Sequence, residues 1–224
     1  MLPSSQPSDD EIKRSLAFVN ELNLKMRRVV DDFAAGMLNR TQFHMLYDRY
    51  QSQLNRIMQL GNDPTATQEL INAPRGEETI LIKRRLTARA IGLSVYSNRS
   101  GLPLETMGEF SVDPALLVPM LSSYRAATRE IFKAGMRSTT MENGQWLWFV
   151  PGHYTTLIAL FSDELSRLQV NTLERMHRDF ETANRAALEQ DTVDASALAF
   201  PFLTFVQRAH QEQHSAAKDM ASKR

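Results

Sequence analysis

The five histidines are the first residues whose chemistry could give this sequence a catalytic or metal-binding site. His210 and His214 stand one helical turn apart with Glu212 between them, a spacing that two metal ligands on a helix can use. However, the stretch HQEQH is not the HExxH order of zinc proteases, and it lies in a polar tail. We therefore expect these two histidines to belong to a solvated helix end.

The other three histidines stand in patterns that favour structural roles. His44 shares a predicted helix face with Asp48, and we expect a surface or capping role for this pair. His177 lies among charged neighbours in the last predicted helix, which is typical of a solvated face. His153 follows a Pro-Gly turn, and no nucleophile or acid motif stands near it.

The remaining residue types form no catalytic motif. The sequence has no cysteine, which excludes disulfides, thiolate catalysis and cysteine-ligated zinc or iron–sulfur sites. It also has no G-x-S-x-G elbow, no glycine-rich phosphate loop and no dinucleotide-binding fingerprint. Carboxylates are scattered beside lysines and arginines, so no pair invites a general acid and base interpretation. The sequence therefore predicts a protein that is not an enzyme and that has no metal or cofactor.

Charge and hydropathy limit the partners in a similar way. The 26 basic and 26 acidic residues balance, which gives no general attraction to a nucleic-acid backbone. The densest basic run, Lys83 to Arg89, is best interpreted as a solvated helix face. The N-terminus lacks the pattern of a signal peptide, and the most apolar windows are too short to span a bilayer. We expect a cytoplasmic protein with no membrane insertion.

The first third of the sequence predicts two long amphipathic helices. Residues 1–8 are expected to be disordered, 9–61 to form an antiparallel helical hairpin, and 62–76 to be a linker. Apolar residues recur at helical spacing in the first helix: Ile12, Leu16, Val19, Leu22, Met26, Val30, Phe33 and Met37. The second helix has such a face as well: Phe43, Leu46, Tyr47, Tyr50, Leu54 and Ile57. A two-helix hairpin has little core of its own. The apolar faces of these helices must therefore pack against the rest of the chain or against another subunit.

Residues 77–187 have the pattern of an α+β domain. A helix from 77 to 88 is followed by strands at 90–97 and 102–107, a helix from 113, strands at 137–142, 145–150 and 153–162, and a last helix that Asp163 caps. One face of that helix is predicted to be formed by Leu165, Leu168, Thr172, Met176, Phe180 and Ala183. This order predicts a five-stranded antiparallel meander sandwiched by helices. Residues 188–224 are expected to be a partly disordered C-terminal extension.

Three local features refine this prediction. Pro103 cannot donate to a central ladder, so the second strand should begin at an edge or a bulge. Asn143-Gly144 suits a type I′ hairpin turn. Trp146 and Trp148 alternate along a strand and so point to the same face, either as core beneath a helix or as an exposed contact patch.

Two stretches of this domain resemble the roadblock/dynein light chain family. In AIGLSVYSNRSGLPLET an apolar strand ends in an N-x-x-G turn and continues as x-P-[LIV]-x-[ST], like the first hairpin of that family. PGHYTTLIALFSDE resembles the family's later turn-and-strand signature. The resemblance covers residues 77–187, and longin and profilin domains are close in architecture. The N-terminal helical hairpin lies outside the family's standard domain.

This resemblance implies a non-enzymatic role. Proteins of the family commonly dimerise by joining their sheets edge to edge and packing their central helices, and many are platforms for small Ras-like GTPases. The expected homodimer interface lies on the helix from 113 to 134, at Leu117, Leu121, Tyr124, Arg125 and Thr128. The alternative is a small-molecule sensor of profilin- or PAS-like architecture, which needs a cavity with convergent polar groups.

Overall fold

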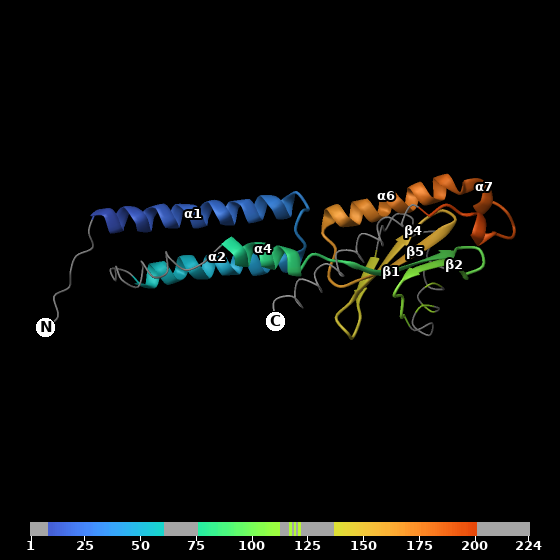
Figure 1. Ribbon diagram of the computed structural model, residues 1–224, viewed down its shortest axis with the longest axis horizontal. Helices are drawn as coiled ribbons and strands as arrows, with labels where there is room; N and C mark the ends of the chain where they lie inside the picture. Colours follow the sequence, from blue (N-terminus) through green and yellow to red (C-terminus); the bar gives the residue numbers. More distant parts are fainter. Residues whose placement is uncertain are drawn as a thin grey trace, which may run out of the picture. The chain divides into compact units, whose positions relative to one another are not determined.

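The computed structural model describes residues 9–60, 76–112, 117, 119, 121 and 137–200. The chain divides into two compact units, Met1–Thr87 and Ala88–Arg224 (Figure 1). The predicted disordered residues 1–8 and most of the predicted linker lie outside the described residues.

The first unit is built on two long antiparallel helices, α1 (Asp9–Ala34) and α2 (Arg40–Leu60), as the sequence predicts (Figure 1). Gly36, with a φ of 75°, follows the end of α1 in the left-handed conformation that glycine adopts readily. Asn39 then caps α2: its side chain accepts from the backbone N–H of Gln42 at 2.8 Å, and the Gln42 side chain accepts from the Asn39 N–H at 2.9 Å. The buried side chains between the helices include Phe18, Leu22, Val29, Leu46, Tyr50 and Ile57.

A third helix, α4 (Gly76–Arg85), belongs to this first unit and not to the α+β domain. It packs against the hairpin through Ile82. The division between the units therefore falls between Thr87 and Ala88, whereas the sequence suggested a boundary within 62–76. The sequence places α4 wrongly because polar contacts, described below, join it to the hairpin.

The second unit is an α+β domain with a five-stranded antiparallel sheet. Its strands are β1 (Ala90–Ser97), β2 (Pro103–Gly108), β3 (Arg137–Thr140), β4 (Trp146–Pro151) and β5 (Thr155–Phe161). The α+β class and the antiparallel pairing are as predicted, but the strand order is β2-β1-β5-β4-β3, so the sheet is not one continuous meander. β1 and β5 pair at the centre because both are apolar along most of their length and are largely buried on both faces.

Side chains pack against both faces of the sheet, so the core has two sides. On one side α6 (Arg167–Ala183) and α7 (Arg185–Leu188) pack over the sheet (Figure 1), with a short 3-10 turn at Ala195–Ala197. On the other side the buried apolar residues are Val112, Leu117, Leu121, Leu147, Phe149, Ile158 and Leu160. Leu188 and Leu198 are both buried in the first of these cores, so the domain continues past residue 187, where the sequence placed an extension.

The last long helix begins later than predicted, and its buried face differs in part from the prediction. Ser166, and not Asp163, is its N-cap, and Ser166 and Gln169 form a reciprocal capping box. Leu168 is 56% exposed, whereas the buried residues are Leu173, His177, Phe180 and Glu181. The predicted face is right in part, since Phe180 is buried and Met176 packs against the same core. It is wrong at Leu168, and it misses His177 and Glu181, because a hydrophobic pattern does not count polar residues that point into the core.

The three local predictions have different outcomes. Pro103 begins an edge strand beside a register shift at Val95/Tyr96, as expected. Trp148 is buried and Trp146 packs against the same core, so the core interpretation holds for this pair. The type I′ prediction was wrong: Gly144 has a φ of 81°, but Asn143 does not have the positive φ that this turn requires.

Candidate functional site

The predicted interface residues are only partly within the described structure. Leu117 and Leu121 are 3% and 7% exposed and pack with Phe149 and Leu160 inside the domain. Tyr124, Arg125 and Thr128 lie outside the described residues. The interface role of this helix stays a prediction, while the two leucines as described are part of the chain's own core.

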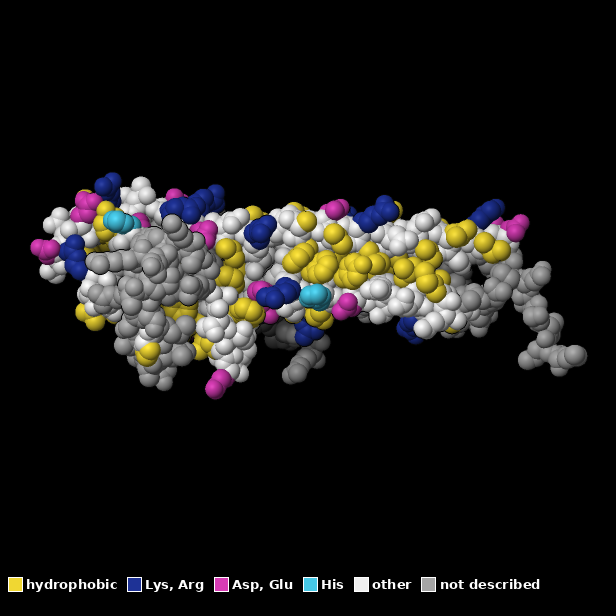
Figure 2. Space-filling model, turned by 180° about the vertical axis from the view of Figure 1, so that it is seen from behind, with side chains coloured by type: hydrophobic (Ala, Val, Ile, Leu, Met, Phe, Trp, Pro, Cys, Tyr) yellow, Lys and Arg dark blue, Asp and Glu magenta, His cyan; other side chains and the backbone are white. Residues whose placement is uncertain are grey.

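The first unit exposes large apolar side chains along its two long helices (Figure 2). Ile12, Leu16, Val30 and Phe33 of α1 are between 40% and 59% exposed. We call the following set the apolar band: Ile12, Leu16, Val19, Met26, Val30 and Phe33 of α1, with Phe43, Tyr47, Leu54 and Met58 of α2. Five members of the band are exposed, namely Ile12, Leu16, Val30, Phe33 and Met58, and the other five are partly buried against the hairpin's own core. An exposed apolar surface of this kind is a candidate site of interaction.

Aromatic rings join the two helices at one end of the apolar band. The rings of Phe33 and Phe43 stack with their centroids 4.5 Å apart, and Tyr47 lies 5.5 Å beyond Phe43. The contact between Phe33 and Phe43 crosses from α1 to α2, so at this end the band is two helices wide. The hydrophobic pattern of the sequence identified most of these residues but assigned them to a buried face.

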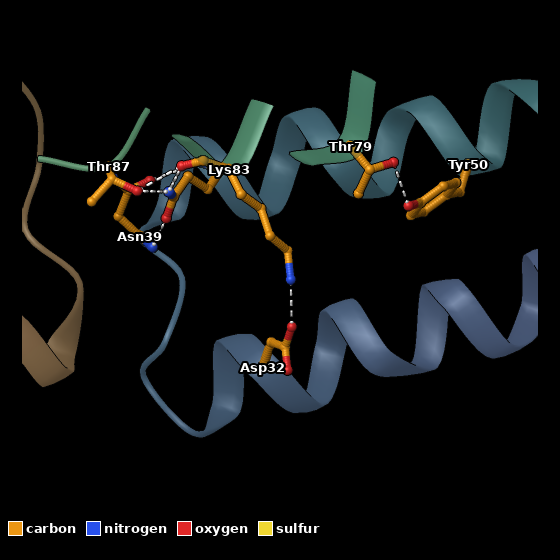
Figure 3. Close-up of polar contacts among 7 residues, drawn as sticks. Asp32, Asn39, Tyr50, Thr79, Lys83 and Thr87 are labelled. Atoms are coloured by element: carbon orange, nitrogen blue, oxygen red, sulfur yellow. Dashed lines mark hydrogen bonds and ion pairs between the residues drawn. The ribbon is translucent and has the colours of Figure 1, made fainter. Parts of the chain in front are cut away.

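Another side of the hairpin is closed by α4 through polar contacts (Figure 3). Lys83 forms an ion pair with Asp32 of α1 at 2.8 Å, and Thr79 bonds the Tyr50 hydroxyl at 3.0 Å. Gln42 donates to the backbone carbonyl of Lys83 at 2.9 Å, and Asn39 donates to that of Leu86 at 2.9 Å. The two residues that cap α2 thus also hold the end of α4. The basic run at Lys83 is therefore in part structural.

In the second unit, the densest polar cluster surrounds the buried carboxylate of Glu181. It accepts backbone N–H groups of His153, Tyr154 and Thr155 at 2.8, 2.9 and 2.8 Å, and the Thr155 hydroxyl at 2.8 Å. A side chain at Gly152 would collide with the same carboxylate. Glu181 therefore holds the turn between β4 and β5 against α6.

The same cluster contains a threonine, a histidine and a glutamate, which are residue types used in catalysis. Because a carboxylate only accepts, the Thr155 hydroxyl donates its single hydrogen to Glu181. The Thr155 oxygen then accepts from Nε2 of His177, at 2.9 Å. A general base must take the proton of its nucleophile, so His177 is oriented the wrong way to activate Thr155. Both side chains are at most 1% exposed, and the arrangement is that of a structural network.

His177 was predicted to lie on a solvated face, and this prediction was wrong. Its side chain is buried and its ring stacks with Phe180 at 6.4 Å between centroids. Burial lowers the pKa of His177 from 6.5 to about 4, and the nearby Glu181 carboxylate opposes this shift. His177 is therefore neutral at physiological pH, in agreement with its role as a donor to Thr155.

A second polar contact ties two turns of the sheet together. Asn98, in the β1–β2 turn, donates to the backbone carbonyl of Gly152 at 3.0 Å and accepts from the Thr156 hydroxyl at 2.7 Å. Its backbone N–H donates to the carbonyl of Tyr154 at 2.9 Å. The N-x-x-G turn that the sequence emphasised is thus fixed to the turn before β5.

A cleft of about 490 Å³ lies beside these two turns. Its lining includes Arg99, Leu102, Tyr154, Leu188 and Val193. Arg99 is held by the Gln190 carbonyl at 2.9 Å and by Asp191 at 3.0 Å. Tyr154 donates to Glu189 at 2.7 Å, and Arg185 also bonds Glu189, which lowers the pKa of that carboxyl. This cleft is the candidate ligand site of the second unit.

The described part of the chain lacks two further features. None of its helices has the length and apolar character that crossing a membrane requires. Within the same residues, no three His, Asp or Glu side chains gather in a way that could hold a metal ion. His210 and His214 lie outside these residues.

Comparison with known proteins does not identify the chain. No protein-family model matches it, and no curated protein matches it significantly.

Proposed function

We propose that the protein is a non-enzymatic interaction protein, a dimeric platform or regulator for a small Ras-like GTPase or another signalling protein. The observation that carries a binding function is the apolar band, which leaves large side chains exposed along two helices. The polar cluster at Glu181 supports the non-enzymatic part, because its hydrogen bonds are used within the fold.

The choice of a GTPase as partner rests on the resemblance to the roadblock family. Residues 90–106 and 151–164 supply that resemblance. The proposal is supported at the level of fold class, because the resemblance implies an α+β domain with a five-stranded antiparallel sheet. β2 forms one edge of the sheet, and several of its side chains are exposed, so it is the strand we propose for edge-to-edge pairing.

The test is a binding measurement between the full chain and the small GTPases of the same organism, each loaded with GDP or with a GTP analogue that is not hydrolysed. Biolayer interferometry with the immobilised chain should give binding that depends on the nucleotide. Leu102→Asp, beside the edge strand, should weaken the binding, while Leu168→Asp on α6 should not. These leucines are 65% and 56% exposed, so the two substitutions are matched. The GTPase proposal would be abandoned if no GTPase bound, or if binding ignored the nucleotide.

The cleft near Tyr154 favours a second candidate, a small-molecule sensor. It combines apolar walls at Leu102, Leu188 and Val193 with polar groups at Asn98 and Arg99, which is the composition of ligand sites. A metabolite that fits should raise the melting temperature of the chain, and Val193→Trp, which fills the cleft, should abolish that rise. A rise that persists in Val193→Trp would place the ligand elsewhere.

A further inference from the structure

Apolar residues along one side of α1 follow a regular seven-residue pattern. Positions 12, 16, 19, 23, 26, 30 and 33 alternate steps of four and three, which is the spacing of a coiled-coil seam. Six of the seven are apolar and the seventh is Asn23. Val19 and Met26 of this pattern are partly buried against the core of Phe18, Leu22 and Val29, whereas Ile12, Leu16, Val30 and Phe33 are 40% to 59% exposed. The seam therefore lies next to the buried face of α1, and the described residues leave it exposed mainly toward its two ends.

We infer that the first unit self-associates, with the apolar band of one chain packed against the apolar band of a second copy. This interface uses the apolar band on which the proposed binding function rests, and it gives the dimeric part of that proposal its surface. It is separate from the edge-strand pairing in the second unit. The sequence pattern predicts that the apolar face of the hairpin packs against another surface, and a second copy would provide that surface.

The dimensions of the band favour a partner built of long helices. At about 1.5 Å per residue, the 26 residues of α1 extend over roughly 39 Å. The band is also two helices wide at the end where Phe33 and Phe43 join α1 to α2. A short peptide covers neither the length nor the width of this surface. A second copy presents a helical surface of equal length and width.

Asn23 and the net charge favour a second copy in particular. A single asparagine in an apolar helical seam is a device that sets register and the number of chains, at some expense of stability. Asn23 is exposed and lies in the middle of the seam. The chain has no net charge, so two copies do not repel each other over long distances.

The experiment is sedimentation equilibrium of the full chain over a wide range of protein concentration. We expect the mass to rise with concentration from 25.5 kDa toward twice that value. Leu16→Asp places a charge in the seam and should weaken dimerisation at least about tenfold, because an unpaired buried charge is strongly unfavourable. Leu24→Asp is the matched control: it changes the same residue type on the same helix, 64% exposed compared with 59%, but outside the seven-residue pattern. It should leave the dissociation constant unchanged.

Two further variants test whether the seam of α1 is the surface through which the chain associates. Asn23→Leu should tighten the association and produce species larger than a dimer, because the polar residue that limits the number of chains is gone. Deletion of residues 201–224 should leave the dissociation constant unchanged. Circular dichroism should show equal helix content in all variants with substitutions.

Four results would overturn the inference. The first is a full chain that stays monomeric at every concentration, and the second is a chain that dimerises only after residues 201–224 are removed, which would mean that this segment occupies the band. The third is equal weakening by Leu16→Asp and Leu24→Asp. The fourth is an Asn23→Leu variant that associates like the original chain.

Discussion

Replacing Glu181 by alanine should destabilise the second unit more than any other single change at its surface or turns. The substitution removes the acceptor of three backbone N–H groups and one hydroxyl, at a side chain that is only 9% exposed. Each buried donor without an acceptor costs about 1–3 kcal/mol. Water that enters the vacated space can accept some of these hydrogen bonds and so offsets part of the cost. We therefore expect the free energy of unfolding of the second unit to fall by about 3–5 kcal/mol.

Glu181→Gln tests the same reasoning with nearly the same shape. The amide keeps one oxygen for the Oε1 position, which accepts from Tyr154 and from both donors of Thr155. Its NH₂ group, however, then faces the His153 N–H, which had donated to Oε2 at 2.8 Å. We expect an intermediate loss of about 1–2 kcal/mol. Asp179→Ala, an exposed carboxylate on the same helix, is the control and should stay within about 0.5 kcal/mol.

The assay is urea unfolding followed by tryptophan fluorescence. The chain has two tryptophans, Trp146 and Trp148, and both lie in β4, so the signal reports on the second unit alone. If Glu181→Ala lost less than about 1 kcal/mol, or no more than Asp179→Ala, the proposed anchoring of the turn by this carboxylate would be wrong.

Three other changes test the remaining features by the same fluorescence assay. His177 protonates near pH 6.5 in the unfolded chain but only at about 4 in the folded one, so the unfolded state binds more protons between these values. The contribution of His177 to the free energy of unfolding should therefore be complete above pH 6.5 and fall by about 3 kcal/mol as the pH drops to 4. His177→Gln should not show this loss. The prediction would be contradicted if the free energies of unfolding of the two proteins fell in parallel with pH. Ser166→Ala removes the capping box with Gln169 and should cost about 1 kcal/mol, whereas no change would indicate that the cap is unimportant. Gly92→Ala places a Cβ 2.6 Å from the backbone oxygen of Glu109 and should cost about 1–3 kcal/mol; an unaltered midpoint would show that the strands can separate freely there.

Local patterns predicted the elements of the second unit well. β1 was expected at 90–97 and lies there, because an apolar run followed by an N-x-x-G turn determines both its character and its end. Pro103 indicated an edge strand through a property of a single residue, the missing N–H. These features depend on neighbours in the sequence, which is why they could be predicted.

Features that depend on distant partners were not predictable in the same way. The prediction for α6 missed His177 and Glu181 because their hydrogen-bond partners, Thr155 among them, lie in another part of the chain. The unit boundary was wrong because Asn39 and Gln42 bond α4 across more than forty residues of sequence. The helical spacing of apolar residues predicted most members of the apolar band. Such spacing does not indicate whether the surface that packs against these residues belongs to the same chain or to another.

The pairing of β1 with β5 has a consequence for the order in which the chain folds. Ala90 pairs with Phe161 and Ser97 with Thr155, so the centre of the sheet joins the first and last strands of the unit. During synthesis, α1, α2 and α4 leave the ribosome before any strand, and β1 then waits with an apolar edge unpaired until β5 follows. At about 5–20 residues per second this interval lasts roughly several seconds. A nascent chain arrested before Thr155 should therefore hold a folded helical unit beside a hairpin that binds chaperones.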